Sequence, residues 1–135
     1  MLKLENISKY YYSSSNVTCA LRKINLELKV GEFVAITGES GSGKTTLLNI
    51  ISGFDTYEDG EIYFNNQMTS YFDSADWEKY RKDEISFIFQ NYNLIDSYTV
   101  LENVAVTYII DGYSYKKAKE KAKEVLKLVG LEKDA

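Results

Sequence analysis

Three features that often decide a protein's class are scarce in this chain of 135 residues. It has one cysteine, Cys19, so an internal disulfide bond is impossible. We expect Cys19 to be a small, half-buried residue, with a reactive thiol as the alternative. Charged residues interrupt every apolar stretch well short of a membrane span. Basic residues are not in excess, because the net charge is -4, and a general nucleic-acid-binding protein needs clustered Lys and Arg to neutralise phosphates.

The composition indicates one cytoplasmic domain. An apolar content of 44% in a chain of this length supports a single modest core. The chain starts directly with the strand-like residues 1–7 and shows no signal-peptide pattern, so we expect a cytoplasmic location. We expect no nucleic acid among its partners.

A glycine-rich segment fits the phosphate-binding pattern G-x-x-x-x-G-K-[ST] at every fixed position. The segment consists of Gly38, Glu39, Ser40, Gly41, Ser42, Gly43, Lys44 and Thr45, and Thr46 follows it. Residues 33–37 before it predict a short buried strand, and residues 46–51 after it have apolar residues at helical spacing, with Gly53 as a stop. Strand, glycine loop and helix are the context that this pattern needs, which argues against a Gly/Ser turn without a ligand.

The chemistry of this segment suits the phosphates of a nucleotide. Glycines let the backbone turn its N–H groups inward, and the start of a helix adds partial positive charge. Lys44 would reach the β and γ phosphates as a point charge, and the Thr45 hydroxyl would coordinate a Mg²⁺ ion that bridges the same oxygens. We therefore predict a site for nucleotide phosphates at residues 38–46.

The remaining elements follow from periodicity and turn residues. Period-two alternation predicts antiparallel strands at 1–12 and 20–30, joined by a polar turn at 13–16. Further along, the patterns predict a strand at 60–68 that ends in an Asn-Asn turn, a capped helix at 73–82, an apolar strand at 85–89, a helix at 100–110, and a helix opened by Ser114 and closed by Gly130. We expect the apolar face of the last helix to consist of Ala118, Ala122, Val125, Leu126 and Val129. Its lysines are expected to form a solvated face, and the fold class is α/β.

Taken together, these segments resemble the N-terminal half of an ABC-type ATPase, the ATP-binding subunit of an ATP-binding-cassette transporter. The resemblance covers the whole chain. It implies a P-loop NTPase with a partial ABC-type core, an N-terminal antiparallel β-subdomain, and ATP and Mg²⁺ as cofactors.

The opening strand of this family carries an aromatic residue that stacks on adenine. Residues 4–11, Leu-Glu-Asn-Ile-Ser-Lys-Tyr-Tyr, resemble that strand, and the spacing to residues 20–21 favours Tyr11. Tyr10 and Tyr12 are competitors, and a purely structural tyrosine cluster is the alternative. Strand alternation sends Tyr10 and Tyr12 to one side and Tyr11 to the other, so one assignment excludes the others.

A second block, residues 87–94 followed by 99–104, resembles the glutamine loop of one branch of the family. This branch energises macrolide exporters, lipoprotein release and bacitracin-type peptide resistance pumps. The resemblance implies that Gln90 ligates Mg²⁺ or orients the attacking water, which a neutral amide oxygen can do without repelling the γ-phosphate. A polar strand end is the alternative reading of Gln90. The resemblance also implies that the region 91–98 contacts the transmembrane permease subunit.

The sequence departs from the family pattern in several places. Glu39 stands where an uncharged residue is usual, so its carboxylate must point outward, and the usual turn prolines are missing from a chain without proline. The signature segment, the Walker B strand that ends in Asp-Glu, and the switch histidine are not found in these 135 residues. Residues 105–111 imitate the Walker B strand, but we predict a helix there, because Leu101 and Tyr108 fit a helical stripe and no Glu follows Asp111.

We therefore interpret residues 1–135 as an incomplete ABC ATP-binding domain, with Lys44 and Gln90 as its catalytic candidates. The resemblance implies a full-length protein that hydrolyses ATP, pairs with a second ATP-binding subunit, and drives a permease at the inner face of the plasma membrane. The alternatives are a nucleotide-binding fragment without hydrolysis and an ABC ATPase of the DNA-repair or chromosome type. A small P-loop kinase is disfavoured, because only Arg22 and Arg81 are available for an arginine-rich lid.

Overall fold

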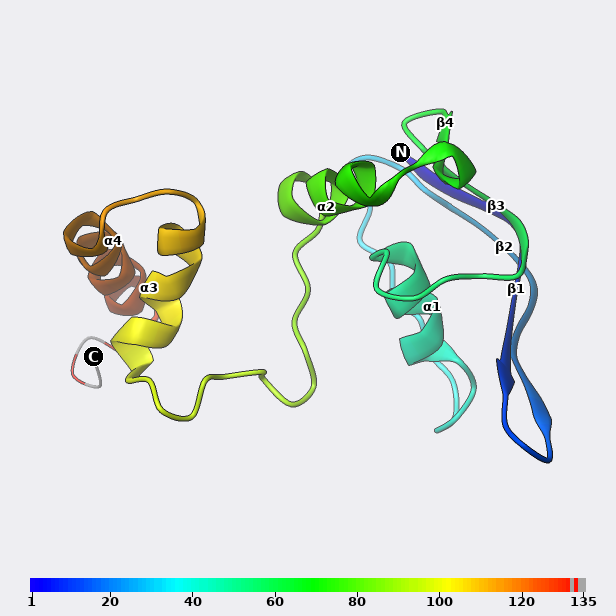
Figure 1. Cartoon of the computed structure of the whole chain (residues 1–135), viewed down its shortest axis with the longest axis horizontal. Coiled ribbons are helices and arrows are strands. Elements are labelled where there is room, and N and C mark those ends of the chain that lie inside the picture. Colours follow the sequence, from blue (N-terminus) through cyan, green and yellow to red (C-terminus); the bar gives the residue numbers. More distant parts are fainter. Residues whose placement is uncertain (132, 134–135) are drawn as a thin grey trace. The chain divides into compact units, whose positions relative to one another are not determined.

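The computed structural model describes residues 1–131 and 133. The chain divides into two units, Met1–Phe87 and Ile88–Ala135, which are described separately (Figure 1). Within the described residues, no helix combines the length and the apolar character that crossing a bilayer requires.

An antiparallel sheet forms one layer of the first unit. It has four strands in the order β2-β1-β3-β4. These are β1 (Leu2–Tyr12), β2 (Val17–Leu28), β3 (Asp59–Phe64) and β4 (Gln67–Met68). The alternation of apolar residues therefore predicted β1 and β2 correctly. The predicted strand 60–68 is interrupted, because Asn65 and Asn66 adopt φ values of 48° and 67° and turn the chain back on itself.

Strand β1 is irregular in its middle. Its pairing with β2 shifts register between Leu4 and Tyr10. Asn6 on β1 (φ 53°) and Lys23 on β2 (φ 47°) both have left-handed backbones, and the Asn6 amide donates to Asn25 Oδ1 at 3.0 Å. Such bulges bend and twist a strand locally. Regular pairing resumes at Tyr10, Tyr11 and Tyr12.

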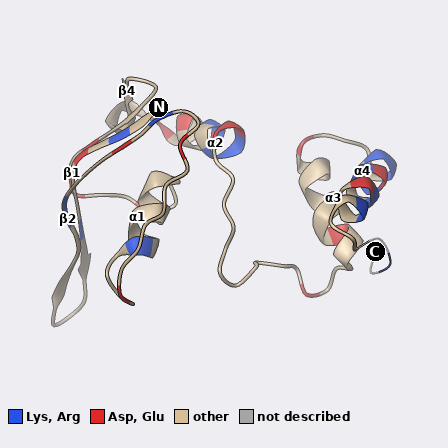
Figure 2. Cartoon of the chain, turned by 180° about the vertical axis from the view of Figure 1, so that it is seen from behind, with Lys and Arg blue, Asp and Glu red and all other residues tan. Residues whose placement is uncertain are grey.

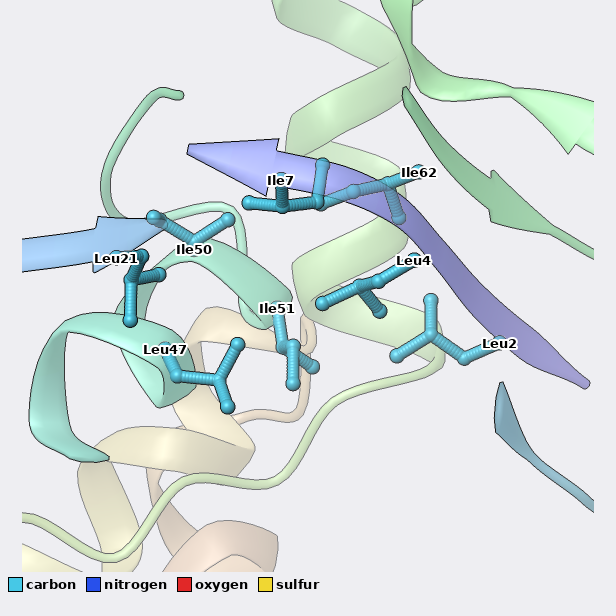
Figure 3. Close-up of a cluster of buried hydrophobic side chains, with 8 residues drawn as sticks. All are labelled: Leu2, Leu4, Ile7, Leu21, Leu47, Ile50, Ile51 and Ile62. Atoms are coloured by element: carbon cyan, nitrogen blue, oxygen red, sulfur yellow. The ribbon is translucent and has the colours of Figure 1, made fainter. Parts of the chain in front are cut away.

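Helix α1 (Lys44–Ile51) packs its apolar side on this sheet. Figure 3 shows the side chains that meet between them: Leu2, Leu4, Ile7, Leu21, Leu47, Ile50, Ile51 and Ile62. Ile7 and Ile50 are 0% exposed. The burial of these aliphatic side chains makes the largest favourable contribution to the folding free energy of the unit. The same packing fixes the position of the start of α1 relative to β1 and β2.

Helix α2 (Ser74–Asp83) follows a short 3₁₀ helix, η1 (Thr69–Tyr71). Asp73 caps α2 as the sequence predicted, since its side chain accepts from the amides of Ala75 and Asp76 at 2.8 and 2.9 Å. The Tyr80 phenol donates to the carbonyl of Ile51 at 2.9 Å and so ties α2 to α1. Burial raises the pKa of Tyr80 to about 12.

Two predicted strands are not formed. Residues 33–37 and 85–89 have no strand structure, and Phe33 is fully exposed. A strand needs a neighbour that accepts and donates its main-chain hydrogen bonds. In the part of the chain that the structure describes, neither segment has such a neighbour. The apolar runs were read correctly, but no strand among the described residues pairs with them.

The second unit contains a helical hairpin. Helices α3 (Val100–Ile110) and α4 (Tyr115–Leu128) bury five small or aliphatic side chains between them: Leu101, Ala105, Ala118, Ala122 and Leu126. Residues 105–110 are helical, as predicted, and Asp111 is the C-cap of α3. Figure 2 shows basic and acidic residues together on α4.

The predicted apolar face of α4 was wrong in two members. Val125 is 36% and Val129 64% exposed. The buried stripe consists of Ala118, Ala122 and Leu126, spaced by four residues, and Val125 lies one position, roughly 100° of helical rotation, away from it.

The N-terminus of α3 offers a test of this unit. Thr99 Oγ1 accepts from the Glu102 amide at 3.2 Å, and the Glu102 carboxylate accepts from the Thr99 amide at 3.0 Å. We expect Thr99→Ala to lower the free energy of unfolding of the helical hairpin by about 1 kcal/mol, measured by hydrogen exchange of the α3 amides. Ser114→Ala is the matched control, because the Ser114 side chain makes no capping hydrogen bond to α4. Equal losses in the two variants would contradict the capping assignment.

Candidate functional site

The glycine-rich segment 38–43 forms a loop that leads into α1 and lies against β2. Gly43 is the N-cap of α1 and has φ 89°. A Cβ atom on Gly43 would lie 2.5 Å from the carbonyl oxygen of Ala20 and 3.0 Å from Leu21 Cδ2. The loop therefore lies so close to β2 that only glycine fits at position 43. Gly41 also has a left-handed backbone, with φ 79°, but faces open space.

The Lys44 ammonium lies inside the curve of this loop. It donates to the carbonyl oxygens of Gly38 and Glu39 at 2.9 and 2.6 Å, and it lies 3.4 Å from Ser42 Oγ. Glu39 is exposed and contributes its main-chain carbonyl to this contact. The partners named here are neutral and do not cancel the charge of Lys44. A positive charge at the N-terminus of a helix is a place where an anion is stabilised.

A cavity of about 290 Å³ opens beside the loop. Its lining combines the predicted residues Tyr11, Gly41, Gly43, Lys44, Thr45 and Thr46 with Thr18, Cys19 and Ala20. Ser40 belongs to the turn of the loop and is exposed. The structure thus brings the predicted aromatic residue and the predicted phosphate loop to one cavity.

Sequence reasoning missed the three cavity residues from β2. The pairing of β1 with β2 sets Tyr11 opposite Thr18 and Tyr10 opposite Cys19, so the predicted hairpin could have pointed to them. Cys19 is exposed, and the expectation of a half-buried thiol was wrong, because its position near the end of the hairpin leaves its side chain uncovered.

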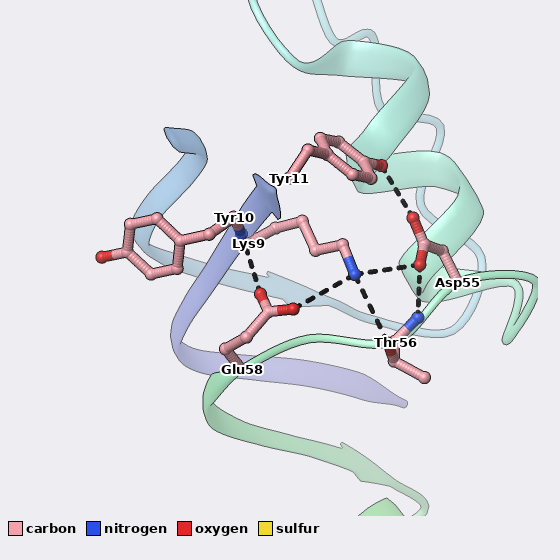
Figure 4. A network of polar contacts seen from close by, with 6 residues as sticks. All are labelled: Lys9, Tyr10, Tyr11, Asp55, Thr56 and Glu58. Carbon is pink, nitrogen blue, oxygen red and sulfur yellow. Dashed lines mark hydrogen bonds and ion pairs between the residues drawn. The ribbon is translucent and has the colours of Figure 1, made fainter. Parts of the chain in front are cut away.

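Of the three neighbouring tyrosines, Tyr11 is the one that lines the cavity. Its phenol donates to Asp55 Oδ2 at 2.7 Å. In Figure 4 the Tyr11 ring points toward α1 and Asp55, while the Tyr10 ring points away from them. Tyr12 is 71% exposed. This arrangement follows the strand alternation that the sequence predicted.

A charged network holds Tyr11 in this position (Figure 4). The Lys9 ammonium is 3.0 Å from Asp55 Oδ1 and 3.3 Å from Glu58 Oε1, and it lies 5.2 Å from the centre of the Tyr11 ring. It also donates to Thr56 Oγ1 at 3.3 Å. Lys9 is 5% exposed, so its charge is balanced by carboxylates as a buried charge requires. No pattern in the sequence signalled this network.

The pKa values of these groups follow from the contacts. Burial disfavours the charged form of Lys9, but its hydrogen bonds and attraction to Asp55 and Glu58 outweigh burial and raise the pKa of Lys9. Burial also opposes ionisation of Asp55, yet the hydrogen bonds from Tyr11 and Lys9 lower the pKa of Asp55. The hydrogen bond to Asp55 and burial raise the pKa of Tyr11, against a hydrogen bond with the Thr46 hydroxyl. Lys9 and Asp55 are therefore both charged in this network. Through Tyr11 and Thr46 the network also contacts the first turn of α1.

Gln90 belongs to the second unit. It is exposed and lies in a turn. Its predicted role at the metal and the attacking water therefore stays a prediction.

A glycine loop that enters a helix, a lysine ammonium inside the loop and hydroxyl groups at the first helical turn define a P-loop nucleotide-binding protein. A sequence profile of the ABC transporter family matches residues 21–135. The chain belongs to this family, and it corresponds to the N-terminal region of the ATP-binding cassette.

Individual relatives agree with this assignment. The chain is 42% identical over 135 residues to the uncharacterized ABC transporter ATP-binding protein MJ0796 of Methanocaldococcus jannaschii, covering 98% of this chain and 57% of that protein. It is 43% identical to the macrolide export ATP-binding/permease protein MacB of Campylobacter fetus, covering 98% of this chain and 21% of MacB. It is 37% identical to the lipoprotein-releasing system ATP-binding protein LolD of Pseudoalteromonas translucida, covering 97% of this chain and 56% of LolD. The predicted resemblance to this export branch is confirmed.

Solved structures confirm the fold class. A dimeric post-hydrolysis state of the cassette MJ0796 bound to ADP and Pi superposes with a TM-score of 0.83 at 42% identity, covering 94% of this chain and 56% of that one. A second dimeric structure of MJ0796 gives a TM-score of 0.84 with the same identity and coverage. The chain spans just over half the length of the cassettes MJ0796 and LolD.

Proposed function

We propose that this chain binds MgATP through residues 38–46 and Tyr11, as part of an ATP-hydrolysing cassette that powers a membrane exporter. The observation that carries this proposal is the single cavity shared by Lys44, Thr45, Thr46 and Tyr11. Lys44 presents its charge to the phosphates, the loop turns main-chain N–H groups toward them, and the Tyr11 ring supplies a flat apolar face for the adenine base.

The donor set of the site also fits a magnesium ion. Mg²⁺ prefers oxygen ligands and binds together with nucleotide phosphates, and the Thr45 hydroxyl lies in the cavity lining next to Lys44. When bound, the ion neutralises charge on the β and γ phosphates. In the whole cassette we propose that Gln90 contributes a further neutral oxygen ligand or orients the attacking water.

The region 91–98 is proposed to contact a transmembrane permease subunit. All eight of its residues are exposed. They include the large side chains Tyr92, Leu94, Ile95 and Tyr98, which are between 41% and 79% exposed. Aromatic residues are enriched at protein interfaces, and exposed apolar patches mark interaction sites. We further propose that the cassette acts as a dimer with a second ATP-binding subunit, as the solved MJ0796 structures are dimers.

The magnesium part of the proposal is tested by Thr45→Val, which removes the hydroxyl and keeps the shape of the side chain. For the unchanged chain we expect ATP to bind about tenfold more tightly with Mg²⁺ than with a chelator, measured by equilibrium dialysis. In Thr45→Val this difference should disappear. Thr18→Val is the matched control, because Thr18 lines the same cavity from β2 and should leave the magnesium dependence intact.

Two results would count against the proposal. Undetectable binding of MgATP to the unchanged chain at millimolar concentration would overturn nucleotide binding itself. If the magnesium dependence of ATP binding survives in Thr45→Val, Thr45 is not a ligand of the metal ion. If it is lost in Thr18→Val as well, the effect is not specific to Thr45, and the assignment of Thr45 as the ligand fails.

A further inference from the structure

The helix that starts at the phosphate loop also anchors the aromatic residue of the site. Helix α1 begins at Lys44 and ends at Ile51. The chain then folds back on the end of the helix, where the amides of Phe54 and Asp55 donate to the carbonyl of Asn49 at 2.9 and 3.3 Å. Asp55 is therefore attached firmly to α1, and its Oδ2 accepts the Tyr11 phenol at 2.7 Å.

Lys9 fixes the other oxygen of the same carboxylate. Oδ1 of Asp55 accepts from the Thr56 amide at 2.7 Å and faces the Lys9 ammonium at 3.0 Å. Lys9 and Tyr11 lie two positions apart on β1, so they share one face of the strand. The carboxylate thus receives two side chains from β1 and holds them against the end of α1 (Figure 4).

The hydrogen bond to Asp55 is the main contact that orders Tyr11, beside the Lys9 ammonium, which lies 5.2 Å from the centre of its ring, and the Thr46 hydroxyl. Tyr11 is 42% exposed, and only Tyr12 separates it from the hairpin turn at 13–16. An exposed aromatic side chain at the tip of a hairpin samples several rotamers, and ordering it on binding lowers affinity. A hydrogen bond that orders the ring in advance removes that cost.

We propose that Asp55, held by Lys9, is a positioning residue that sets the Tyr11 ring at a fixed place relative to the phosphate loop, so that the base and the triphosphate of one nucleotide bind together. This inference rests on the proposed nucleotide-binding function. It assigns Asp55 a role in the affinity for ligands that carry a base, and none in the affinity for a bare triphosphate, which reaches only the loop and Lys44.

The test compares MgATP with magnesium tripolyphosphate, both titrated into the chain by calorimetry. Tyr11→Phe keeps the ring and removes the phenol. We expect it to weaken MgATP binding about fivefold, the size of one lost hydrogen bond, and to leave tripolyphosphate binding unchanged. Asp55→Ala should have the same selective effect, and the double variant should be no weaker than the single ones, because all three lack the same contact. Tyr10→Phe is the matched control, since the Tyr10 ring points away from Asp55, and it should bind both ligands as the unchanged chain does.

Several outcomes would overturn the inference. These are unchanged MgATP affinity in Tyr11→Phe, additive losses in the double variant, and an equal loss of tripolyphosphate binding, which would mean that the contact only supports the fold. If the unchanged chain binds tripolyphosphate but shows no preference for MgATP, the positioning role fails while the phosphate site stands. If it binds neither ligand, the proposed function fails together with the inference.

Discussion

Lys44→Ala is expected to lower the affinity for MgATP by about 100-fold, because it removes a charge-assisted hydrogen bond to the phosphates. Lys44 Nζ donates to the carbonyl oxygens of Gly38 and Glu39, so the ammonium lies at the centre of the loop. Among the described residues that line the cavity, Lys44 alone carries a positive charge. Its loss leaves the phosphates with N–H donors and the partial charge of the helix. Equilibrium dialysis with labelled ATP measures the change.

The matched control for this variant is Lys79→Ala. Lys79 is an exposed lysine of α2 in the same unit, so the variant removes the same net charge at another place. It should leave the affinity within about twofold of the unchanged chain, because an exposed charge at a distance is screened by salt. A similar loss in both variants would show that net charge, and not the position of Lys44, governs binding.

Gly43→Ala is expected to lower the free energy of unfolding of the first unit by about 3 kcal/mol and to abolish MgATP binding. Two effects add at this position. The φ value of 89° disfavours any residue with a Cβ atom, and the new methyl group would lie 2.5 Å from the Ala20 carbonyl oxygen. The loop must therefore move away from β2, which displaces the N-terminus of α1 and Lys44 with it.

Gly41→Ala separates these two effects. Gly41 has φ 79°, but a Cβ atom there would meet no atom within 4 Å. We expect a loss of about 1 kcal/mol from the backbone alone. Urea unfolding followed by the fluorescence of Trp77, the one tryptophan of the chain, measures both variants. Equal losses would contradict the close approach of the loop to β2.

The sequence predicted those parts of the fold whose signals are local. Helix α3 has its capping pair at Thr99 and Glu102, α2 has its cap at Asp73, and the β1–β2 hairpin shows its alternation within a few residues. The segments 33–37 and 85–89 were mispredicted as strands because pairing with a neighbour, and not the apolar run itself, makes a strand.

The candidate site likewise has a part that the sequence predicted and a part that it did not. The phosphate loop and the side of β1 that Tyr11 occupies could be read from the sequence, since both depend on neighbouring residues. The partner of Tyr11 could not, because Asp55 lies 44 residues away along the chain and carries no motif. Glu58 lies 49 residues from Lys9. Contacts of this range depend on how α1 packs on the sheet, which becomes visible only in three dimensions.

The most direct measurement is a titration of the ¹⁵N-labelled chain with MgATP, followed by the backbone amide signals in NMR spectra. Binding at the phosphate loop predicts large, saturable shifts of Gly41, Gly43, Lys44, Thr45 and Thr46, together with Tyr11 across the cavity, and a midpoint about 100-fold higher in Lys44→Ala. Saturable shifts centred on other residues, or an unchanged midpoint in Lys44→Ala, would contradict the assignment of this loop as the nucleotide site.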